Sequence, residues 1–161
     1  MSKRILSIII SLLLLSACGF TLRGIDTQVL SANLQQIELI HSNSSNELGQ
    51  ILRRSLSASG VEIIENSSAY KLILGDEQRL ERIVSFNRNV RSGEYRLTLI
   101  SSFQLQNNGE TILASEIISL DQIYEADPSN ASAKTNEAEL VITELRQALA
   151  EQILRRLQSV K

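Results

Sequence analysis

The chain has 161 residues, with 16 Lys and Arg against 18 Asp and Glu, a formal net charge of −2, and one His, one Cys and no Trp. This length suits one domain of ordinary size, and the mild acidity disfavours general nucleic-acid binding, which depends on neutralising many phosphates. A single His and a single Cys form no Cys/His metal set, and one Cys allows no intramolecular disulfide.

The first 18 residues have the layout of a bacterial export signal. Two cations precede an apolar run over residues 5–15, and a helix of that length, at about 1.5 Å per residue, falls short of the roughly 30 Å hydrocarbon core. The motif Leu15-Ser16-Ala17-Cys18 resembles the bacterial lipobox, in which cleavage precedes a lipid-modified Cys. We therefore expect residues 1–17 to be a cleaved lipoprotein signal peptide. The alternative is an ordinary signal peptide that leaves Cys18 as a free thiol.

The lone Cys favours lipidation. An unpaired, exposed thiol is a liability in an oxidising compartment, and here the lipid would consume the only thiol in the chain. We expect no cofactor apart from the N-acyl and S-diacylglycerol groups on Cys18, and several acyl chains anchor a protein stably. Gly19, in place of the Asp that favours inner-membrane retention, indicates an outer-membrane anchor that faces the periplasm.

Removal of the signal leaves 144 residues with a formal charge of −4, because two of the cations lie within it. Residues 24–36 are polar and weakly patterned, and we interpret residues 18–34 as the lipidated N-terminus and a tether. Residues 35–161 then form a single domain.

The domain opens with a strand and a helix. Gln35–His41 is a short, partly alternating apolar run that predicts the strand. Ser44 and Glu47 form a possible capping box for the helix, and Gly60 supplies its stop. The apolar residues of this helix recur at helical spacing: Leu48, Ile51, Leu52 and Leu56.

The middle of the chain reads as strands. Val61–Glu65 is a short β-prone piece, Asn66–Ser68 a turn, and Tyr70–Phe86 alternates loosely as one long strand. A polar loop follows over Asn87–Gly93, before the strict period-two pattern of Tyr95–Leu105.

Asn108-Gly109 predicts a tight hairpin, because both residues tolerate positive φ. Thr111–Tyr124 is the return strand. We expect one face of it to carry Ile112, Ala114, Ile118 and Leu120.

Asp127 and Pro128 read as the N-cap and first residue of a long final helix that runs to Lys161. Its apolar stripe comprises Ala138, Val141, Ile142, Leu145, Leu149, Ile153, Leu157 and Val160. Two amphipathic helices and one amphipathic sheet bury each other's apolar faces. We therefore predict an α+β two-layer sandwich, with two helices packed on a mostly antiparallel or mixed four-stranded sheet.

No arrangement of residues points to catalysis. His41 has no second imidazole to pair with, and a lone His at a strand end is more often structural. The carboxylate pairs Glu62/Glu65 and Glu137/Glu139 lie where solvated faces are expected. We predict that the protein is not an enzyme and holds no metal, although acid–base work by Asp and Glu alone stays open.

Basic residues gather in one stretch: Arg79, Arg82, Arg88, Arg91 and Arg96. On strands, such cations alternate with acids and form solvated faces with cross-strand pairs. Arg88 and Arg91 differ, because they lie at a loop tip with few acidic neighbours, where guanidinium groups can grip phosphate bidentately. The sequence leaves these two as either phosphate contacts or solvated cations.

The residues after the lipobox, CGFTLRG from Cys18 to Gly24, resemble the mature N-terminus of the lipopolysaccharide (LPS)-assembly lipoprotein LptE family. The resemblance continues through the Gly60-Val61-Glu62 helix end, the Glu94-Tyr95 strand start and the segment Ala133–Glu137. It spans nearly the whole mature chain. Many relatives have His where this chain has Thr21, and some have a longer C-terminal tail.

The resemblance implies a two-layer fold and an outer-membrane lipoprotein that plugs the lumen of the LptD barrel, helps to assemble it, and binds LPS for delivery to the outer leaflet. By position, the family's LPS-binding cations correspond to Arg88 and Lys134, and Arg91 is a nearby addition of ours. The alternative is a tethered structural or assembly factor of another envelope complex, without a lipid ligand, and an envelope enzyme ranks third.

Overall fold

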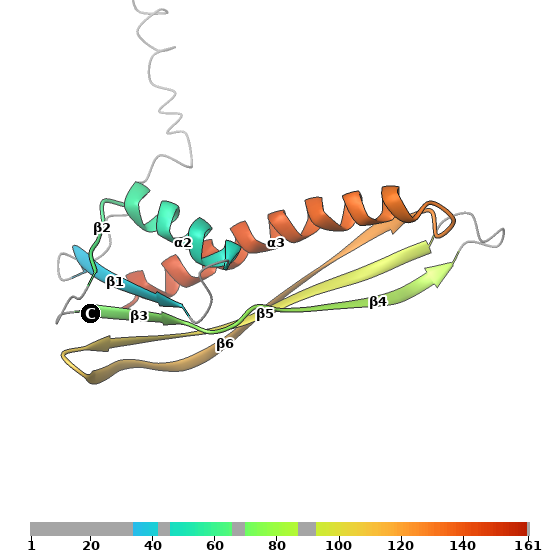
Figure 1. The fold of residues 1–161 in the computed structure, drawn as a ribbon. Helices are drawn as coiled ribbons and strands as arrows, with labels where there is room; N and C mark the ends of the chain where they lie inside the picture. The colour runs from blue at the N-terminus through green and yellow to red at the C-terminus, as the bar shows by residue number, and fades with distance from the viewer. Residues whose placement is uncertain (1–33, 42–45, 66–69, 87–92, 161) are drawn as a thin grey trace, which may run out of the picture.

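The computed structural model describes residues 34–41, 46–65, 70–86 and 93–160. Two helices lie on one face of a single curled sheet (Figure 1). The elements, in chain order, are β1 Gln36–His41, α2 Glu47–Ala58, β2 Glu62–Ile63, β3 Tyr70–Leu74, β4 Gln78–Phe86, β5 Gly93–Asn107, β6 Glu110–Ala126 and α3 Ala131–Gln158. The predicted α+β two-layer class is confirmed.

The sheet is mixed and has six strands in the described part of the chain, where we expected four. Strands β2, β1 and β3 are neighbours in that order, β3 and β4 pair with successive parts of one edge of β5, and β6 pairs with the other edge. β1 runs parallel to β2 and β3, whereas β3, β4 and β6 all pair antiparallel with β5. The strand β5 is therefore the centre of the fold.

The single long strand predicted over Tyr70–Phe86 is wrong, because it is broken into β3 and β4. Both pieces pair with the same edge of β5, but between them residues 75–77 oppose only residues 101–102. At this bulge the Gly75 N–H donates to the Ser102 carbonyl at 2.8 Å, and a Cβ on Gly75 would lie 2.2 Å from Ser102 Oγ. The extra residue reverses which side chains face the helices.

The hairpin is confirmed. Asn108 and Gly109 have φ of 50° and 83° and connect the pair Asn107–Glu110, so the loop has two residues with positive φ. The predicted face of the return strand is wrong at its start. Two register shifts in the β5–β6 ladder bring Leu113 inward at 8% exposure and leave Ile112 outside at 40%.

Both predicted N-caps are wrong. Ser44 lies outside the described residues, and the N-cap of α2 is Asn46, whose Oδ1 accepts from the Gly49 N–H at 3.0 Å. The N-cap of α3 is Asn130, whose Oδ1 accepts from the Ala133 N–H at 3.1 Å. Asp127 instead forms a preceding turn, in which its carboxylate accepts from the Ser129 N–H.

The stop at Gly60 is confirmed. Gly60 has φ of 83°, and its N–H donates to the Ser57 carbonyl, while the Val61 N–H donates to the Leu56 carbonyl. This is a Schellman motif, which satisfies carbonyls that the helix end leaves unpaired. The accompanying apolar contact is present, because Val61 and Leu56 are both buried.

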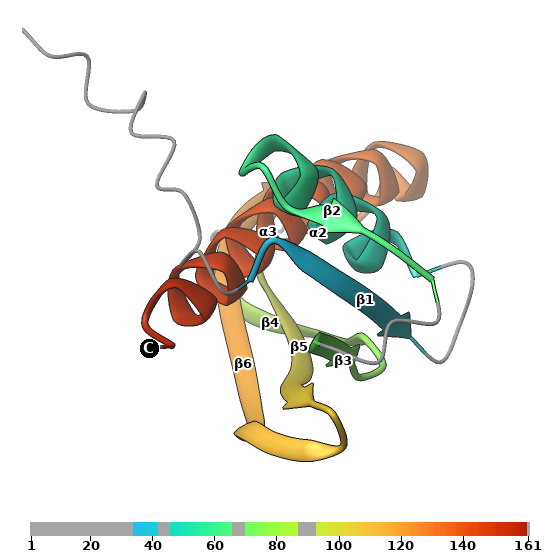
Figure 2. The ribbon, with the colours of Figure 1, turned by 90° about the vertical axis from the view of Figure 1, so that its left-hand side faces the viewer.

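The core lies between the sheet and the two helices. The predicted stripe of α3 is confirmed, with Ala150 added, and Val160 packs at its margin. The core also takes in Leu34, at 1% exposure, one residue before the domain boundary we expected at 35. Figure 2 shows α2 beside α3, whereas in Figure 1 the first half of α3 extends past α2 over β4, β5 and β6.

The observed N-caps predict which Asn and Ser substitutions lower the free energy of unfolding. Asn46→Ala and Asn130→Ala should each lower the free energy of unfolding by about 1 kcal/mol, because each leaves a helix N–H without its acceptor. Ser44→Ala, the cap that the sequence favoured, is the matched control and should change it by less than about 0.5 kcal/mol. Urea unfolding followed by circular dichroism measures all three, and a larger loss for Ser44→Ala would contradict this assignment.

Candidate functional site

Three of the predicted functional residues, Cys18, Arg88 and Arg91, lie outside the described residues. The segment that carries both arginines joins β4 to β5, and the Phe86 and Gly93 that flank it are paired with each other. Gly93 also pairs with Ala126, shortly before α3 begins. The segment is therefore attached to the end of the sheet at which α3 starts (Figure 1).

Lys134, the remaining candidate, lies at that same end, in the first turns of α3. Its ammonium is 3.1 Å from Glu81 Oε1 on β4 and 4.0 Å from the centre of the Tyr95 ring on β5. The Lys134 and Glu81 side chains are 29% and 32% exposed. Lys134 is thus a half-buried cation that already has a counterion and an aromatic face beneath it.

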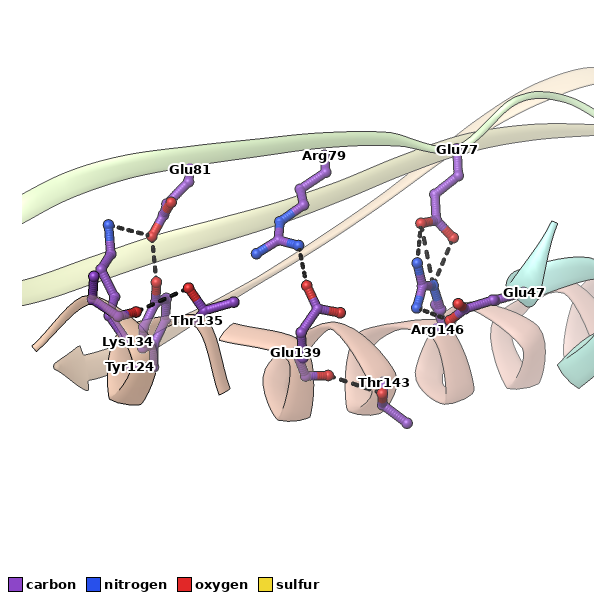
Figure 3. A network of polar contacts seen from close by, with 11 residues as sticks. Glu47, Glu77, Arg79, Glu81, Tyr124, Lys134, Thr135, Glu139, Thr143 and Arg146 are labelled. Atoms are coloured by element: carbon purple, nitrogen blue, oxygen red, sulfur yellow. Dashed lines mark hydrogen bonds and ion pairs between the residues drawn. The ribbon is translucent and has the colours of Figure 1, made fainter. Parts of the chain in front are cut away.

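A pair of tyrosines supports this ion pair. The rings of Tyr95 and Tyr124, opposite each other on β5 and β6, stack at a centroid distance of 5.5 Å. The Tyr124 hydroxyl donates to Glu81 Oε1, the oxygen that also meets Lys134 (Figure 3). Burial raises the pKa of Tyr124, and so does the neighbouring Glu81 carboxylate, so this hydroxyl keeps its proton.

The ionised form of Glu81 is stabilised by its neighbours. Partial burial by itself raises the pKa of this carboxyl, but the hydrogen bonds from Tyr124 and Lys134 and the charges of Lys134 and Arg79 together lower it. The result is a pKa below the ordinary value, so Glu81 is a carboxylate at neutral pH.

Two further contacts continue along the same helix and strand (Figure 3). Arg79 Nη1 donates to Glu139 Oε1 at 2.7 Å. Arg146 binds Glu77 through two parallel hydrogen bonds, Nε to Oε2 at 2.9 Å and Nη2 to Oε1 at 2.7 Å. We call the six residues that meet here the charged seam: Glu77, Arg79 and Glu81 on the β4 side, and Lys134, Glu139 and Arg146 on α3.

Arg146 is the most enclosed residue of the charged seam. Its side chain is 12% exposed and that of Glu77 16%, and its Nη1 also donates to Glu47, the first residue of α2. The hydrogen bonds from Arg146 to Glu77 raise the pKa of the guanidinium, against the effect of burial. This residue therefore ties both helices to the sheet.

The charged seam is electrically neutral, with three cations against three carboxylates in alternating order. The sequence predicted that the strand arginines pair with acids across strands. For Arg79 this is wrong, because it pairs with Glu139 on α3, whereas Arg96 does pair across strands, with Asp121 at 3.4 Å. An anion that approaches Lys134 therefore finds no excess positive charge among the described side chains. It must displace a carboxylate or use the arginines of segment 87–92.

Glu81, Tyr95 and Tyr124 were not predicted from the sequence to be functional. Glu81 was visible only as an acid within the basic stretch, and Tyr95 only as the first residue of the period-two pattern. Their meeting with Lys134 depends on the β4–β5–β6 registers, which no local pattern specifies.

A hollow of about 310 Å³ lies near the other end of α3, over Phe103 and Ile118. Two arginines line it, but Arg156 is paired with Glu116 at 2.6 Å and Arg155 with Glu151 at 3.6 Å. These cations are neutralised, and the hollow lies at the end of α3 opposite to Lys134.

His41 takes a structural position. A Cβ added to Gly49 would lie 3.2 Å from His41 Cδ2, so the imidazole packs against the first turn of α2. The described residues contain no group of three His, Cys, Asp or Glu that could hold a metal ion. Among those same residues, no helix is both long enough and apolar enough to span a membrane.

Comparison with known proteins agrees with the resemblance seen in the sequence. Residues 34–157 match the family model described as LptE, lipopolysaccharide-assembly. The LPS-assembly lipoprotein LptE of Yersinia enterocolitica is 30% identical over 98% of this chain and 77% of its own length, and that of Yersinia pestis is 29% identical over 99% and 78%.

Solved structures show the same fold. An uncharacterized lipoprotein B from Nitrosomonas europaea superposes with a TM-score of 0.68 at 21% identity, covering 88% of this chain and 91% of that one. The rare lipoprotein B of Shewanella oneidensis gives a TM-score of 0.64 at 24% identity, covering 77% and 94%.

The lowered pKa of Glu81 predicts a pH-dependent contribution to stability. A carboxyl whose folded-state pKa lies below its ordinary value of 4.5 stabilises the fold above that pH and loses the contribution as the pH falls through the folded-state pKa. Glu81→Gln should therefore be less stable than the parent at pH 7, and the difference should shrink below pH 4.5. Urea unfolding at pH 7 and pH 3.5 measures this.

Glu125→Gln, at an exposed position on the same sheet, is the matched control and should track the parent at both pH values. A deficit of Glu81→Gln that is as large at pH 3.5 as at pH 7 would show that packing, and not charge, is what the substitution removes.

Proposed function

The chain belongs to the LptE family of LPS-assembly lipoproteins, and on that premise we propose that it plugs an LptD-like outer-membrane barrel and binds LPS during delivery to the outer leaflet. The family is a non-enzymatic one that serves LPS assembly, so the chain is an LPS-assembly lipoprotein and not an enzyme. The match over residues 34–157 carries this conclusion, because it covers almost all of the described domain.

The shape and surface of the domain support a plug. The 28 residues of α3 extend about 42 Å at 1.5 Å per residue, and the sheet runs beside the helix over much of that length (Figure 1). A wide barrel has a polar lumen that must be filled or gated. An elongated domain whose long helix carries paired charges is compatible with such a lumen.

The start of α3 is the part of the domain proposed to contact LPS. The phosphates of lipid A require cations, and Lys134 is placed at the end to which the segment with Arg88 and Arg91 is attached. Arg88 and Arg91 would add beside Lys134 the excess positive charge that the charged seam lacks. A lipid on Cys18 would anchor the domain, through the tether, to the periplasmic leaflet of the outer membrane.

The LPS contact is tested with neutral substitutions, because a charge reversal at Lys134 would place a second carboxylate against Glu81. Arg88→Gln with Lys134→Gln should weaken LPS binding about tenfold, or about 1.4 kcal/mol, since two phosphate contacts lose their cations. Equilibrium binding of purified LPS to the detergent-solubilised protein measures the change, and added salt should weaken the parent's binding as well.

The matched control is Arg53→Gln with Arg54→Gln, which removes the same charge from the exposed face of α2. The control variant should bind LPS clearly more tightly than the Arg88/Lys134 variant. Equal LPS binding by the parent and the Arg88/Lys134 variant at low salt would place the site elsewhere and favour an assembly factor without a lipid ligand.

The anchor has its own test. Cys18→Ala should yield an unprocessed precursor that no longer incorporates labelled fatty acid, because the acceptor thiol is gone and no other Cys exists in the chain. Metabolic labelling followed by immunoprecipitation reads this out. Label in the variant would mean that the lipid is attached to another residue, and that Cys18 is then an ordinary thiol.

A further inference from the structure

We infer that Glu81 limits the affinity of Lys134 for a phosphorylated lipid headgroup, because the carboxylate and a phosphate compete for one ammonium. The inference rests on the proposed function and specifies how that site is tuned. It follows from three features: the directions in which Lys134 is already occupied, the way Glu81 is held, and the exposure of the pair.

The Lys134 ammonium has few directions left for a ligand. It carries three N–H donors; Glu81 Oε1 takes one side at 3.1 Å, and the Tyr95 ring covers another at 4.0 Å. A phosphate oxygen must therefore either share the remaining side with a carboxylate next to it or replace the carboxylate. Sharing is opposed by like-charge repulsion over a few ångströms, in a place only partly screened by solvent.

Glu81 stays in place when Lys134 is taken by another anion. The hydroxyl of Tyr124 donates to the same Oε1, and stacking against Tyr95 fixes the ring that carries it. The carboxylate thus keeps a hydrogen-bond partner without Lys134, and its charge remains beside any bound phosphate. Glu81 therefore remains beside a bound anion and lowers the affinity of Lys134 for it.

The exposure of the pair makes the exchange feasible. With side chains 29% and 32% exposed and a single N–O contact, the Lys134–Glu81 pair is of the weak, solvent-accessible kind. The Arg146–Glu77 pair contrasts with it, at 12% and 16% exposure and with a bidentate geometry. The charged seam thus combines one enclosed pair, which holds the fold, with an exchangeable pair at the end where the headgroup is proposed to bind.

Glu81→Gln tests the inference. The amide keeps an acceptor for Tyr124 and Lys134 but removes the charge, so the full-length lipidated protein in detergent should bind purified LPS at least threefold more tightly than the parent. The gain should disappear in a Lys134→Met background, and it should be small with dephosphorylated LPS. Glu81→Asp, which keeps the charge but withdraws it by one methylene, gives a second variant in case Glu81→Gln folds poorly.

Glu116→Gln is the matched control. Like Glu81→Gln, it removes one negative charge that is paired with a cation of α3. That cation is Arg156, which lies about 33 Å from Lys134 along the helix, beyond the range of screened charges. It should leave LPS binding unchanged.

The outcomes separate the inference from the proposed function. A parent that does not bind LPS at all contradicts the proposed function. A parent that binds, a Lys134→Met variant that binds more weakly and a Glu81→Gln variant equal to the parent would overturn the inference alone. Weaker binding by both Glu81→Gln and Glu81→Asp would overturn it too, because Glu81 would then position Lys134 for the ligand.

Discussion

The contact on which this fold most depends is Arg146 with its two carboxylates. One guanidinium, 12% exposed, joins Glu77 at the start of β4 and Glu47 at the start of α2 from the middle of α3. Removing one partner of an enclosed pair costs several kcal/mol, because the remaining charge stays buried without compensation. The contact ties both helices to the sheet at one point, beside the apolar core that they share with it.

From this fixed point the two halves of α3 differ in what they contact. The second half lies beside α2 and buries leucine and isoleucine in the core. The first half has β4, β5 and β6 beneath it and buries Ala138, Val141 and Ile142, while its contacts with β4 are the ion pairs of the charged seam. These half-exposed pairs contribute less to stability than the apolar burial does. The end of the domain that carries Lys134 is therefore both polar and open to exchange with an anionic ligand.

The parts of the structure that could be predicted from the sequence are those specified by residues near one another in the chain. The period-two pattern from Tyr95, the Asn108-Gly109 hairpin and the Gly60 helix stop each depend on local backbone preferences, and each is confirmed. The N-caps were wrong because nearby Ser, Asp and Asn residues have similar capping strength, so local preference does not choose among them.

The errors and omissions in the sheet have a different cause. The bulge at Gly75 and the register shifts opposite Leu113 depend on the pairing of distant strands, and each changes which face a side chain occupies. The same holds for the candidate site. Lys134 could be carried over by position from the family resemblance, but its partners Glu81 and Tyr95 come from β4 and β5, and only the fold brings them together.

The most direct test of the account is mass spectrometry of what co-purifies with the detergent-solubilised, lipidated protein from its own envelope. We predict a stoichiometric outer-membrane β-barrel protein of the LptD kind, together with LPS. A complex that contains only soluble or peptidoglycan-bound proteins, with neither a barrel nor LPS, would contradict the account.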